Sequence, residues 1–197
     1  YSVSVGLGSR PVNFVSFYDV LRFANWLNNG QGSGDTETGA YTLLGGTATP
    51  SNGLTVTRNV GANIVLPSEN EWYKAAYYNP VSGSFFDYPA GADVQTICAW
   101  PTPALNRANC NNVAGNVADV GAYAGSASPS GTFDQGGNLY EWNEEIVSGS
   151  NRGLRGGDFY NPSNHLAASF RSFDLPANED IDVGFRVTRL EPNAIDW

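Results

Sequence analysis

Charge and methionine are scarce in this chain, and their scarcity excludes several classes of protein. Charged residues make up 15% of the 197 residues, below the roughly one quarter that is usual in a globular domain. The net charge is −9, which excludes nucleic acid as a partner because phosphate binding needs a cationic face. No run of 18 apolar residues is present, so the sequence predicts no membrane span.

The remaining composition indicates one domain outside the cytosol. Hydrophobic residues make up 41% of the chain, enough for a core, while Lys74 is its only lysine and methionine is absent. Solubility therefore rests on Asn, Ser, Thr and Gly, and we expect an extracellular or cell-surface protein with a single domain over residues 1–197. The excess of carboxylates favours divalent cations as partners. The first residue is Tyr1 rather than Met, which indicates a mature, processed or partial protein.

Two cysteines, Cys98 and Cys110, are the only ones in the chain. Outside the cytosol such a pair favours a disulfide, which would stabilise the fold by about 3 kcal/mol in the chain-entropy model. The alternative is a pair of thiols that binds a soft metal ion. His165 is the only histidine, and this excludes an iron or zinc site built from several histidines.

A first helix is predicted after Ser16, because Ser16 and Asp19 have the spacing of a capping box. The sequence Asn-Asn-Gly at 28–30 is typical of a helix end. Four apolar side chains at helical spacing are expected to face the core, namely Val20, Phe23, Ala24 and Leu27.

A second helix is predicted after Ser68, which forms another capping box with Glu71. The pair Asn-Pro at 79–80 would stop it. Its buried stripe is expected to contain Trp72, Ala75 and Ala76.

Short strands and long loops are predicted outside these helices. Residues 30–63 are rich in Gly, Thr and Ser and predict loop and hairpin, with strand-like pieces at 41–44 and 54–57. Residues 82–131 have weak periodicity, and so long a loop region usually carries function or bound ions. The C-terminal part predicts short strands at 138–142, 153–155, 168–171 and 184–188. The sequence therefore predicts an α+β domain.

Five motifs stand out: PVNFVSFYD at 11–19, LPSENEWYKAA at 66–76, GNLYEW at 137–142, LRGGDF at 154–159 and GFRV at 184–187. Together, in this order, they resemble the sulfatase-modifying factor family, which contains the formylglycine-generating enzymes and non-enzymatic relatives. Segments 25–32 and 131–138 resemble in particular a bacterial, surface-sorted, non-catalytic subgroup.

The resemblance implies an irregular C-type lectin-like fold of the formylglycine-generating enzyme family, with two helices, short strands and long ordered loops. Members of the family usually have some tens of residues before the first motif, including an edge strand. Because that motif begins here at Pro11, we expect the family's N-terminal portion to be absent.

The resemblance also locates two catalytic positions, and neither holds a cysteine. Oxidase members carry two cysteines soon after the Gly-Gly of the fourth motif, where they bind Cu(I) and activate oxygen. Aligned on Gly156 and Gly157, these positions hold Asn161 and Leu166, which supply no thiolate. The resemblance therefore implies a protein without catalytic residues and without copper.

Calcium is a further implication of the resemblance. The family's calcium loop is matched by two side chains and two backbone carbonyls, those of Asp134, Gly137, Leu139 and Glu141. In the alternative interpretation, Asp134 caps a turn and Glu141 pairs with an arginine.

A second calcium site of the family would use Asn109 and the carbonyl of Cys110, with an acceptor from residues 112–119. Three arginines in family motifs are expected to pair with buried carboxylates such as Glu141 or Asp180. They are Arg155, Arg171 and Arg186.

Loop side chains are the candidates for ligand contact. Trp100 lies in a loop and is the tryptophan expected to reach a ligand, while the tryptophans of fold motifs are expected in the core, namely Trp26, Trp72 and Trp142. Asn161 and His165 are further candidates for ligand contact, and a surface histidine without a ligand is the simpler interpretation of His165.

Three functions remain open from the sequence. The first is a non-catalytic, calcium-stabilised extracellular protein that binds a glycan or protein ligand or assembles with its own copies into a surface layer, matrix or filament. Residues 1–7 alternate polar and apolar side chains and could add to an open sheet edge. The second is a copper-dependent formylglycine-generating oxidase that uses Cys98 and Cys110. The third is a hypervariable ligand-binding protein of the retroelement-diversified kind, with its variable residues over 158–178.

Overall fold

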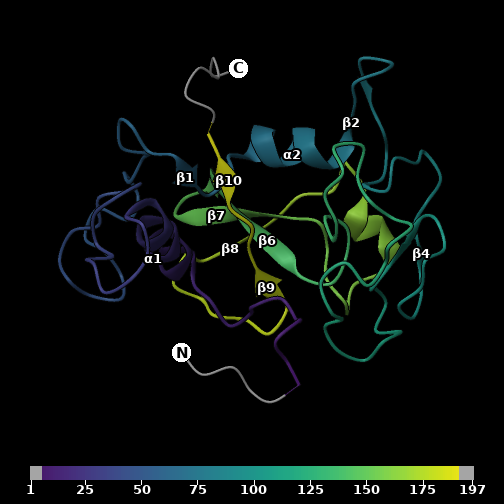
Figure 1. Ribbon diagram of the computed structural model, residues 1–197, viewed down its shortest axis with the longest axis horizontal. Helices are drawn as coiled ribbons and strands as arrows, with labels where there is room; N and C mark the ends of the chain where they lie inside the picture. The colour runs from purple at the N-terminus through teal and green to yellow at the C-terminus, as the bar shows by residue number, and fades with distance from the viewer. Residues whose placement is uncertain (1–5, 191–197) are drawn as a thin grey trace.

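The computed structural model of the chain describes residues 6–190 (Figure 1). Two helices pack against a small central sheet, and long loops fill the side of the molecule away from the first helix. Residues 1–5, most of the segment predicted to add to a sheet edge, lie outside the described residues. No helix in the described part is long and apolar enough to cross a membrane.

Helix α1 spans Phe17–Asn28 and begins where the capping box predicts. The Ser16 hydroxyl accepts a hydrogen bond from the Asp19 amide, and the Asp19 carboxylate accepts one from the Ser16 amide. Two of the amides that a helix leaves free at its start are thereby satisfied.

The main core lies between α1 and the central sheet. Val20 and Ala24 are buried in it as expected. The expectations for Phe23 and Trp26 are wrong, because Phe23 is 38% exposed and Trp26 is only partly buried. The Phe23 ring contacts the rings of Trp26 and Phe185, with centroids 5.6 and 5.3 Å apart.

Helix α2 spans Glu69–Tyr77, and Ser68 and Glu71 form the predicted capping box. The helix ends just before the predicted stop, because the next two residues already form strand β2 (Tyr78–Asn79). Ala75, expected on the buried face, is only partly buried. The fully buried residues of this face are Trp72, Ala76 and Tyr77.

The central sheet has four strands in the order β8-β7-β6-β9. Strand β6 pairs antiparallel with β7 and parallel with β9, and β8 pairs antiparallel with β7. The bounds are Tyr140–Ser148 for β6, Asn151–Arg155 for β7, Ser172–Asp174 for β8 and Val183–Gly184 for β9.

The strand predicted over 168–171 is wrong by several residues, since β8 begins only at Ser172. The carbonyls of Ala168 and Phe170 accept hydrogen bonds from the Arg155 guanidinium. A side chain thus takes backbone acceptors that a strand would use for its ladder.

Six very short strands form three separate pairs outside this sheet. The segments 41–44 and 54–57, predicted as strand-like, form no strand, and a single bridge pairs Tyr41 with Arg58. A short 3₁₀ helix, η1, spans Ser163–Leu166. The pairs are β1 (Ile64–Val65) with β10 (Thr188–Arg189), β2 with β3 (Ser84–Phe85), and β4 (Ile97–Cys98) with β5 (Arg107–Ala108).

The two cysteines form the predicted disulfide, Cys98–Cys110, with their Cα atoms 4.9 Å apart. It joins the end of β4 to the residues after β5, within the loop region of residues 82–131. Cys110 is fully buried and packs in a small core cluster with Leu166. The disulfide therefore anchors loops that contain few strand hydrogen bonds of their own.

Replacing both cysteines by serine is expected to lower the free energy of unfolding by about 3 kcal/mol, because the bridge closes a chain segment with a sequence separation of 12. Urea denaturation followed by tryptophan fluorescence measures this difference. Wild-type protein that has been reduced and alkylated should show a similar loss, and an unchanged midpoint in the serine variant would contradict the prediction.

Candidate functional site

The loop between β7 and η1 contains the two positions at which oxidase members of the resembled family have cysteines. Asp158, which is fully buried, begins this loop after two glycines with positive φ. Its carboxylate accepts hydrogen bonds from the amides of Tyr160 and Asn161 and from the Asn161 side chain. Leu166, at the second position, is fully buried. One position therefore holds a tethered amide and the other an apolar core residue.

The disulfide lies directly beside these two positions, which the sequence did not predict. Cys110 shares a small core cluster with Leu166, and Cys98 packs against this cluster. The Asn111 amide donates a hydrogen bond of 2.8 Å to the carbonyl of Asn161. The chain has thus brought its two sulfur atoms next to the family's catalytic position from a distant part of the sequence. They are joined to each other, so neither is a thiolate.

A pair of carboxyl groups also lies in this region. Asp182, just before β9, is half-buried and shares a side-chain hydrogen bond with Asp158. Burial, followed by this hydrogen bond and the repulsion from Asp158 and Asp180, raises the pKa of Asp182 to about 6. Within the described residues no Lys, Arg or His forms an ion pair with either member of the pair.

His165 is engaged within the protein. Its Nδ1 atom is 2.8 Å from the hydroxyl of Tyr140, and its ring stacks on Phe170 with centroids 3.9 Å apart. The ring therefore holds η1 against the sheet. This structural role accounts for its position without a ligand.

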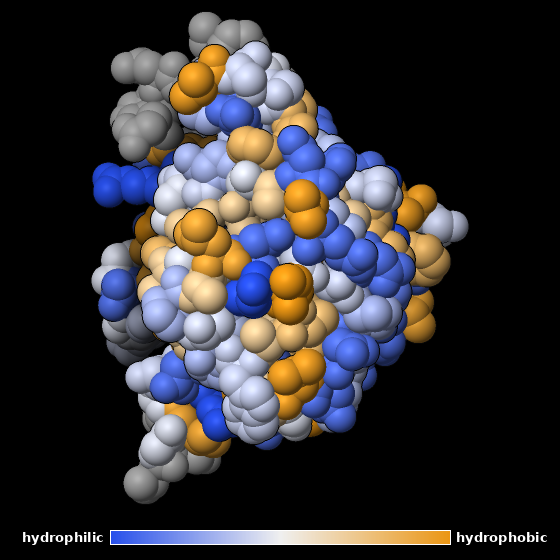
Figure 2. Space-filling model, turned by 90° about the vertical axis from the view of Figure 1, so that its right-hand side faces the viewer, coloured by the Kyte–Doolittle hydropathy of each residue, from blue (hydrophilic) through white to orange (hydrophobic). Residues whose placement is uncertain are grey.

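Trp100, in the loop after β4, is 66% exposed and leaves its ring at the surface. It belongs to the loop side of the molecule, where Figure 2 shows hydrophobic side chains as separate patches among polar ones. A single continuous apolar face is not visible in this view. Trp100 therefore stays a candidate for ligand contact by its exposure alone.

The loop that resembles the calcium loop is held by a buried ion pair. Glu141, which is 7% exposed, accepts hydrogen bonds from the Trp72 indole at 2.7 Å and from the Arg186 guanidinium at 2.6 Å. The predicted pairing of Arg186 with a buried carboxylate is therefore present. Arg155 and Arg171 likewise pair with Glu69.

Asp134 lies nearby, and no basic side chain among the described residues forms an ion pair with it. Its carboxylate accepts one hydrogen bond of 2.7 Å, from the Gly121 amide, and it lines a small, partly open cavity of about 10 Å³. Burial, partly offset by that bond and reinforced by the charge of Glu141, raises the pKa of Asp134. A desolvated carboxylate beside a second one suits a cation ligand.

Asn109 offers a second unsatisfied oxygen. The residue is 1% exposed, and its side-chain nitrogen donates to the carbonyl of Asn116 and to the side chain of Asn138. Its Oδ1 atom is buried without a hydrogen-bond partner. Such an orphaned acceptor fits a cation or a bound water. Asp119, the one carboxylate within 112–119, is exposed.

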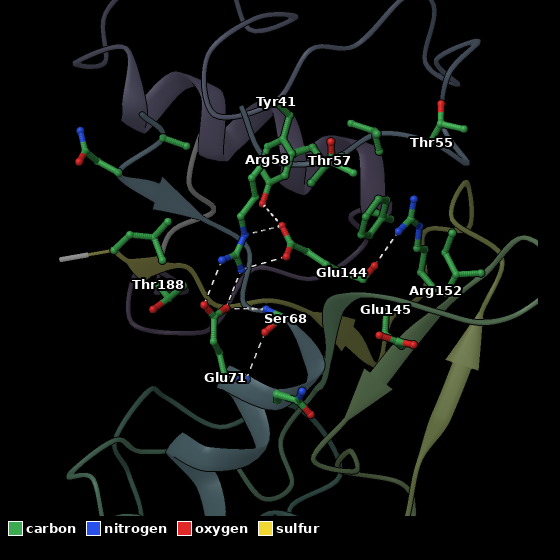
Figure 3. A pocket seen from close by; sticks show the side chains of 18 of the residues that line it. Tyr41, Thr55, Thr57, Arg58, Ser68, Glu71, Glu144, Glu145, Arg152 and Thr188 are labelled. Carbon is green, nitrogen blue, oxygen red and sulfur yellow. Dashed lines mark hydrogen bonds and ion pairs between the residues drawn. The ribbon is translucent and has the colours of Figure 1, made fainter. Parts of the chain in front are cut away.

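The structure also contains a pocket that no sequence motif predicted (Figure 3). It has a volume of about 1270 Å³ and lies between α1, α2 and the outer part of β6. Arg58 crosses it and binds two carboxylates, Glu71 on α2 and Glu144 on β6, with N–O distances of 2.6 and 2.9 Å. The Tyr41 hydroxyl donates to Glu144 at 2.5 Å.

These four residues are far apart in the sequence and belong to no common motif, so no local pattern could have grouped them. Their contacts also set the ionisation of Tyr41. Burial, together with the adjacent Glu144 charge, raises the pKa of the Tyr41 hydroxyl far above its ordinary value. Tyr41 therefore stays protonated at neutral pH and donates a hydrogen bond to the carboxylate.

Asp182 is expected to make the fold less stable as pH rises. Its folded-state pKa of about 6 exceeds the value near 4 of an unfolded aspartate, so its contribution is full below about pH 4 and lost as pH rises through about 6. The variant Asp182→Asn should therefore gain stability relative to the wild type between pH 4 and pH 7.5.

Melting temperatures across this pH range measure the difference between Asp182→Asn and the wild type. Asp119→Asn is a matched control, because Asp119 is exposed. A difference between Asp182→Asn and the wild type that stays constant with pH would show that the carboxyl pair does not share a proton.

Comparison with known proteins gives related sequences and folds. Curated relatives named hercynine oxygenase match from Mycolicibacterium smegmatis, with 32% identity over 91% of this chain and 37% of that protein, and from Mycobacterium tuberculosis, with 30% identity over 62% of this chain and 31% of that protein. The chain thus spans about a third of the length of the curated relatives that it matches.

Solved structures with the same fold include Treponema denticola variable protein 1, with a TM-score of 0.69 and 22% identity over 95% of this chain and 74% of that one. CarF gives a TM-score of 0.67 and 24% identity over 97% of this chain and 72% of that one. At these identities the likeness shows the fold alone, an α+β fold of the C-type lectin-like kind. The model of the family described as "Sulfatase-modifying factor enzyme 1-like domain" matches residues 3–190, and the chain therefore belongs to that family.

Proposed function

We propose that this chain is a non-catalytic extracellular binding domain on the formylglycine-generating enzyme scaffold, stabilised by calcium. The observation that carries the proposal is the state of the oxidase positions. Asn161 is tied to Asp158 by hydrogen bonds, and Leu166 is sealed in the core. Neither can bind Cu(I), which prefers thiolates.

An extracellular location is part of this proposal. A disulfide between buried and partly buried cysteines is typical of proteins in oxidising compartments. The low content of charged residues and the single lysine are in keeping with it. Both features support an extracellular location, whatever ligand the domain binds.

A copper-dependent oxidase is the second candidate, because Cys110 shares a core cluster with Leu166 and Cys98 packs against that cluster. Reduction of the disulfide would place two thiols there. Cys110 is fully buried, and a buried thiol in apolar surroundings resists conversion to the thiolate that copper needs. This geometry favours a structural bridge over a metal site.

Relatives named hercynine oxygenase raise the question of oxygen chemistry. Non-haem iron sites are commonly built from two histidines and a carboxylate. This chain has His165 alone, and that ring is bonded to Tyr140 and stacked on Phe170. A binding role on the shared scaffold therefore remains the better proposal for these 197 residues.

Calcium would be held by Asp134, by the carbonyls of Gly137 and Leu139, and by Glu141. Asp134 has no cation partner in the described part. Glu141 already binds Arg186, but its Oε1 atom receives a single hydrogen bond, which leaves a lone pair for a cation. The ion would supply the second positive charge that two adjacent carboxylates need.

Removal of calcium is expected to lower the melting temperature, because a ligand that binds only the folded state stabilises it by about 2.7 kcal/mol at a hundred times its dissociation constant. Asp134→Ala should abolish this sensitivity to chelator. Glu179→Ala, at an exposed position, is the matched control and should keep it. Identical melting curves for the wild type with calcium and with chelator would count against the site.

Formylglycine formation is expected to be absent. The protein, reduced and supplied with Cu(I) and oxygen, should not convert a cysteine in a sulfatase-type peptide above the level of a blank without protein, as mass spectrometry of the peptide would show. The reason is that Asn161 and Leu166 replace the thiolates. Turnover that disappears in Cys98→Ser would establish the oxidase instead.

A further inference from the structure

The pocket between α1, α2 and β6 has a charge balance opposite to that of the whole protein. Four basic and three acidic side chains line it, whereas the chain as a whole has ten basic and 19 acidic residues and a net charge of −9. Local charge of this kind selects ligands by sign. The basic residues are Arg58, Lys74, Arg152 and Arg189, and the acidic ones are Glu71, Glu144 and Glu145.

All three glutamates of the pocket already have arginine partners. Arg58 binds both Glu71 and Glu144, and Glu145 lies 3.8 Å from Arg171. Figure 3 shows the first two carboxylates turned toward the Arg58 guanidinium. Their negative charge is therefore largely neutralised before any ligand arrives.

The other cations of the pocket lack such partners. Arg152 is 3% exposed, lies over the Phe17 ring at 4.4 Å, and gives two hydrogen bonds to backbone carbonyls, those of Glu144 and Gly53. Its Nε–H donor is buried without a partner. No carboxylate lies within ion-pair distance of Arg152 among residues 6–190.

Lys74 and Arg189 stand on the rim of the same pocket and are exposed. Neither has an ion-pair partner in the described part of the chain. A buried guanidinium with an unused donor and two rim cations together favour an anionic ligand, because an unpaired buried charge is costly until it is compensated.

Neutral polar groups make up much of the rest of the lining. Thr55, Thr57 and Thr188 provide hydroxyls, and Asn63 and Asn70 provide amides. Hydroxyl and amide groups both donate and accept hydrogen bonds, as the hydroxyls of a sugar do. The volume of about 1270 Å³ exceeds what a single small molecule needs.

We propose that this pocket binds an acidic saccharide, an oligosaccharide that contains uronic acid residues. Its carboxylates are neutralised by Arg152, Lys74 and Arg189, and its hydroxyls bind the threonines and asparagines of the lining. An acidic peptide matches the lining less well, because its backbone presents alternating amides and carbonyls that a sheet edge satisfies better. The inference rests on the proposed binding function and names the ligand class for it.

Titration of the calcium-loaded protein with a tetramer of galacturonic acid tests this proposal by calorimetry. We expect binding that weakens as salt is added and that disappears when the carboxyl groups of the tetramer are methyl-esterified. The esterified tetramer keeps the length and most hydroxyls, so it isolates the contribution of charge. An oligoglutamate of equal charge is the third ligand, and it should bind more weakly than the tetramer.

Single variants locate the site. Lys74→Gln and Arg189→Gln should each weaken binding about three- to fivefold, the usual effect of a partly solvated charge pair. Arg152→Lys keeps the charge but removes the Nε donor, and should weaken binding more than either rim variant if its melting curve shows it folded. Arg10→Gln removes one charge outside the pocket lining and should leave the affinity unchanged.

Four results would overturn the proposal: no binding of the tetramer, equal binding of the esterified tetramer, tighter binding of oligoglutamate, or equal losses in Arg10→Gln and the rim variants. The rim residues are exposed, so their variants decide the matter even where Arg152→Lys does not fold. Calcium dependence and the absence of formylglycine formation are measured separately. A failure of the saccharide proposal therefore leaves the proposed non-catalytic, calcium-stabilised function intact. A failure of that function would be detected by the calcium and formylglycine assays.

Discussion

The carboxylate of Glu141 is the group on which the rest of the structure depends, because it joins its own strand to two other parts of the chain. It lies on β6 and receives hydrogen bonds from Trp72 of α2 and from Arg186 after β9. Arg186 also donates to the carbonyl of Phe133, which lies in the loop that leads into β6. A carboxylate that is 7% exposed is stable only when paired and hydrogen-bonded. Loss of Arg186 would leave the buried carboxylate unpaired, and loss of Trp72 would remove one of its hydrogen bonds, so helix, sheet and loop are fixed together.

Buried arginines also bind backbone carbonyls and carboxylates in other parts of this fold, whose strands are mostly short. Arg155 binds Glu69 and two loop carbonyls, and Arg152 binds the carbonyls of Glu144 and Gly53. Strands of two or three residues form few ladder bonds, so buried side chains must satisfy the remaining backbone acceptors. This use of arginine inside the molecule is consistent with the low content of charged residues in the sequence, since several of the few charges form partly or fully buried pairs.

Local signals explain what could be predicted from the sequence. The capping boxes at Ser16 and Ser68 involve residues three apart, and both helices begin where those pairs indicate. The disulfide followed from there being two cysteines. The outward position of Phe23, the late start of β8 and the approach of Cys110 to Leu166 depend on contacts between distant segments. The network around Arg58 could not be predicted from the sequence for the same reason, because its four residues come from four separate elements or loops.

The family's catalytic position and the pocket between α1 and α2 differ in whether their polar groups already have hydrogen-bond or ion-pair partners. At the family's catalytic position, Leu166 and Cys110 are fully buried, and Asp158 has its oxygens occupied by neighbouring amides. Asp182, which shares a hydrogen bond with Asp158, is only half-buried. The pocket between α1 and α2 contains cations without carboxylate partners among the described residues and an unused donor on Arg152. Binding free energy comes from groups that gain partners on association, since satisfied groups only exchange one partner for another. The proposed ligand site therefore lies in the pocket rather than at the two positions where the resembled oxidases have their cysteines.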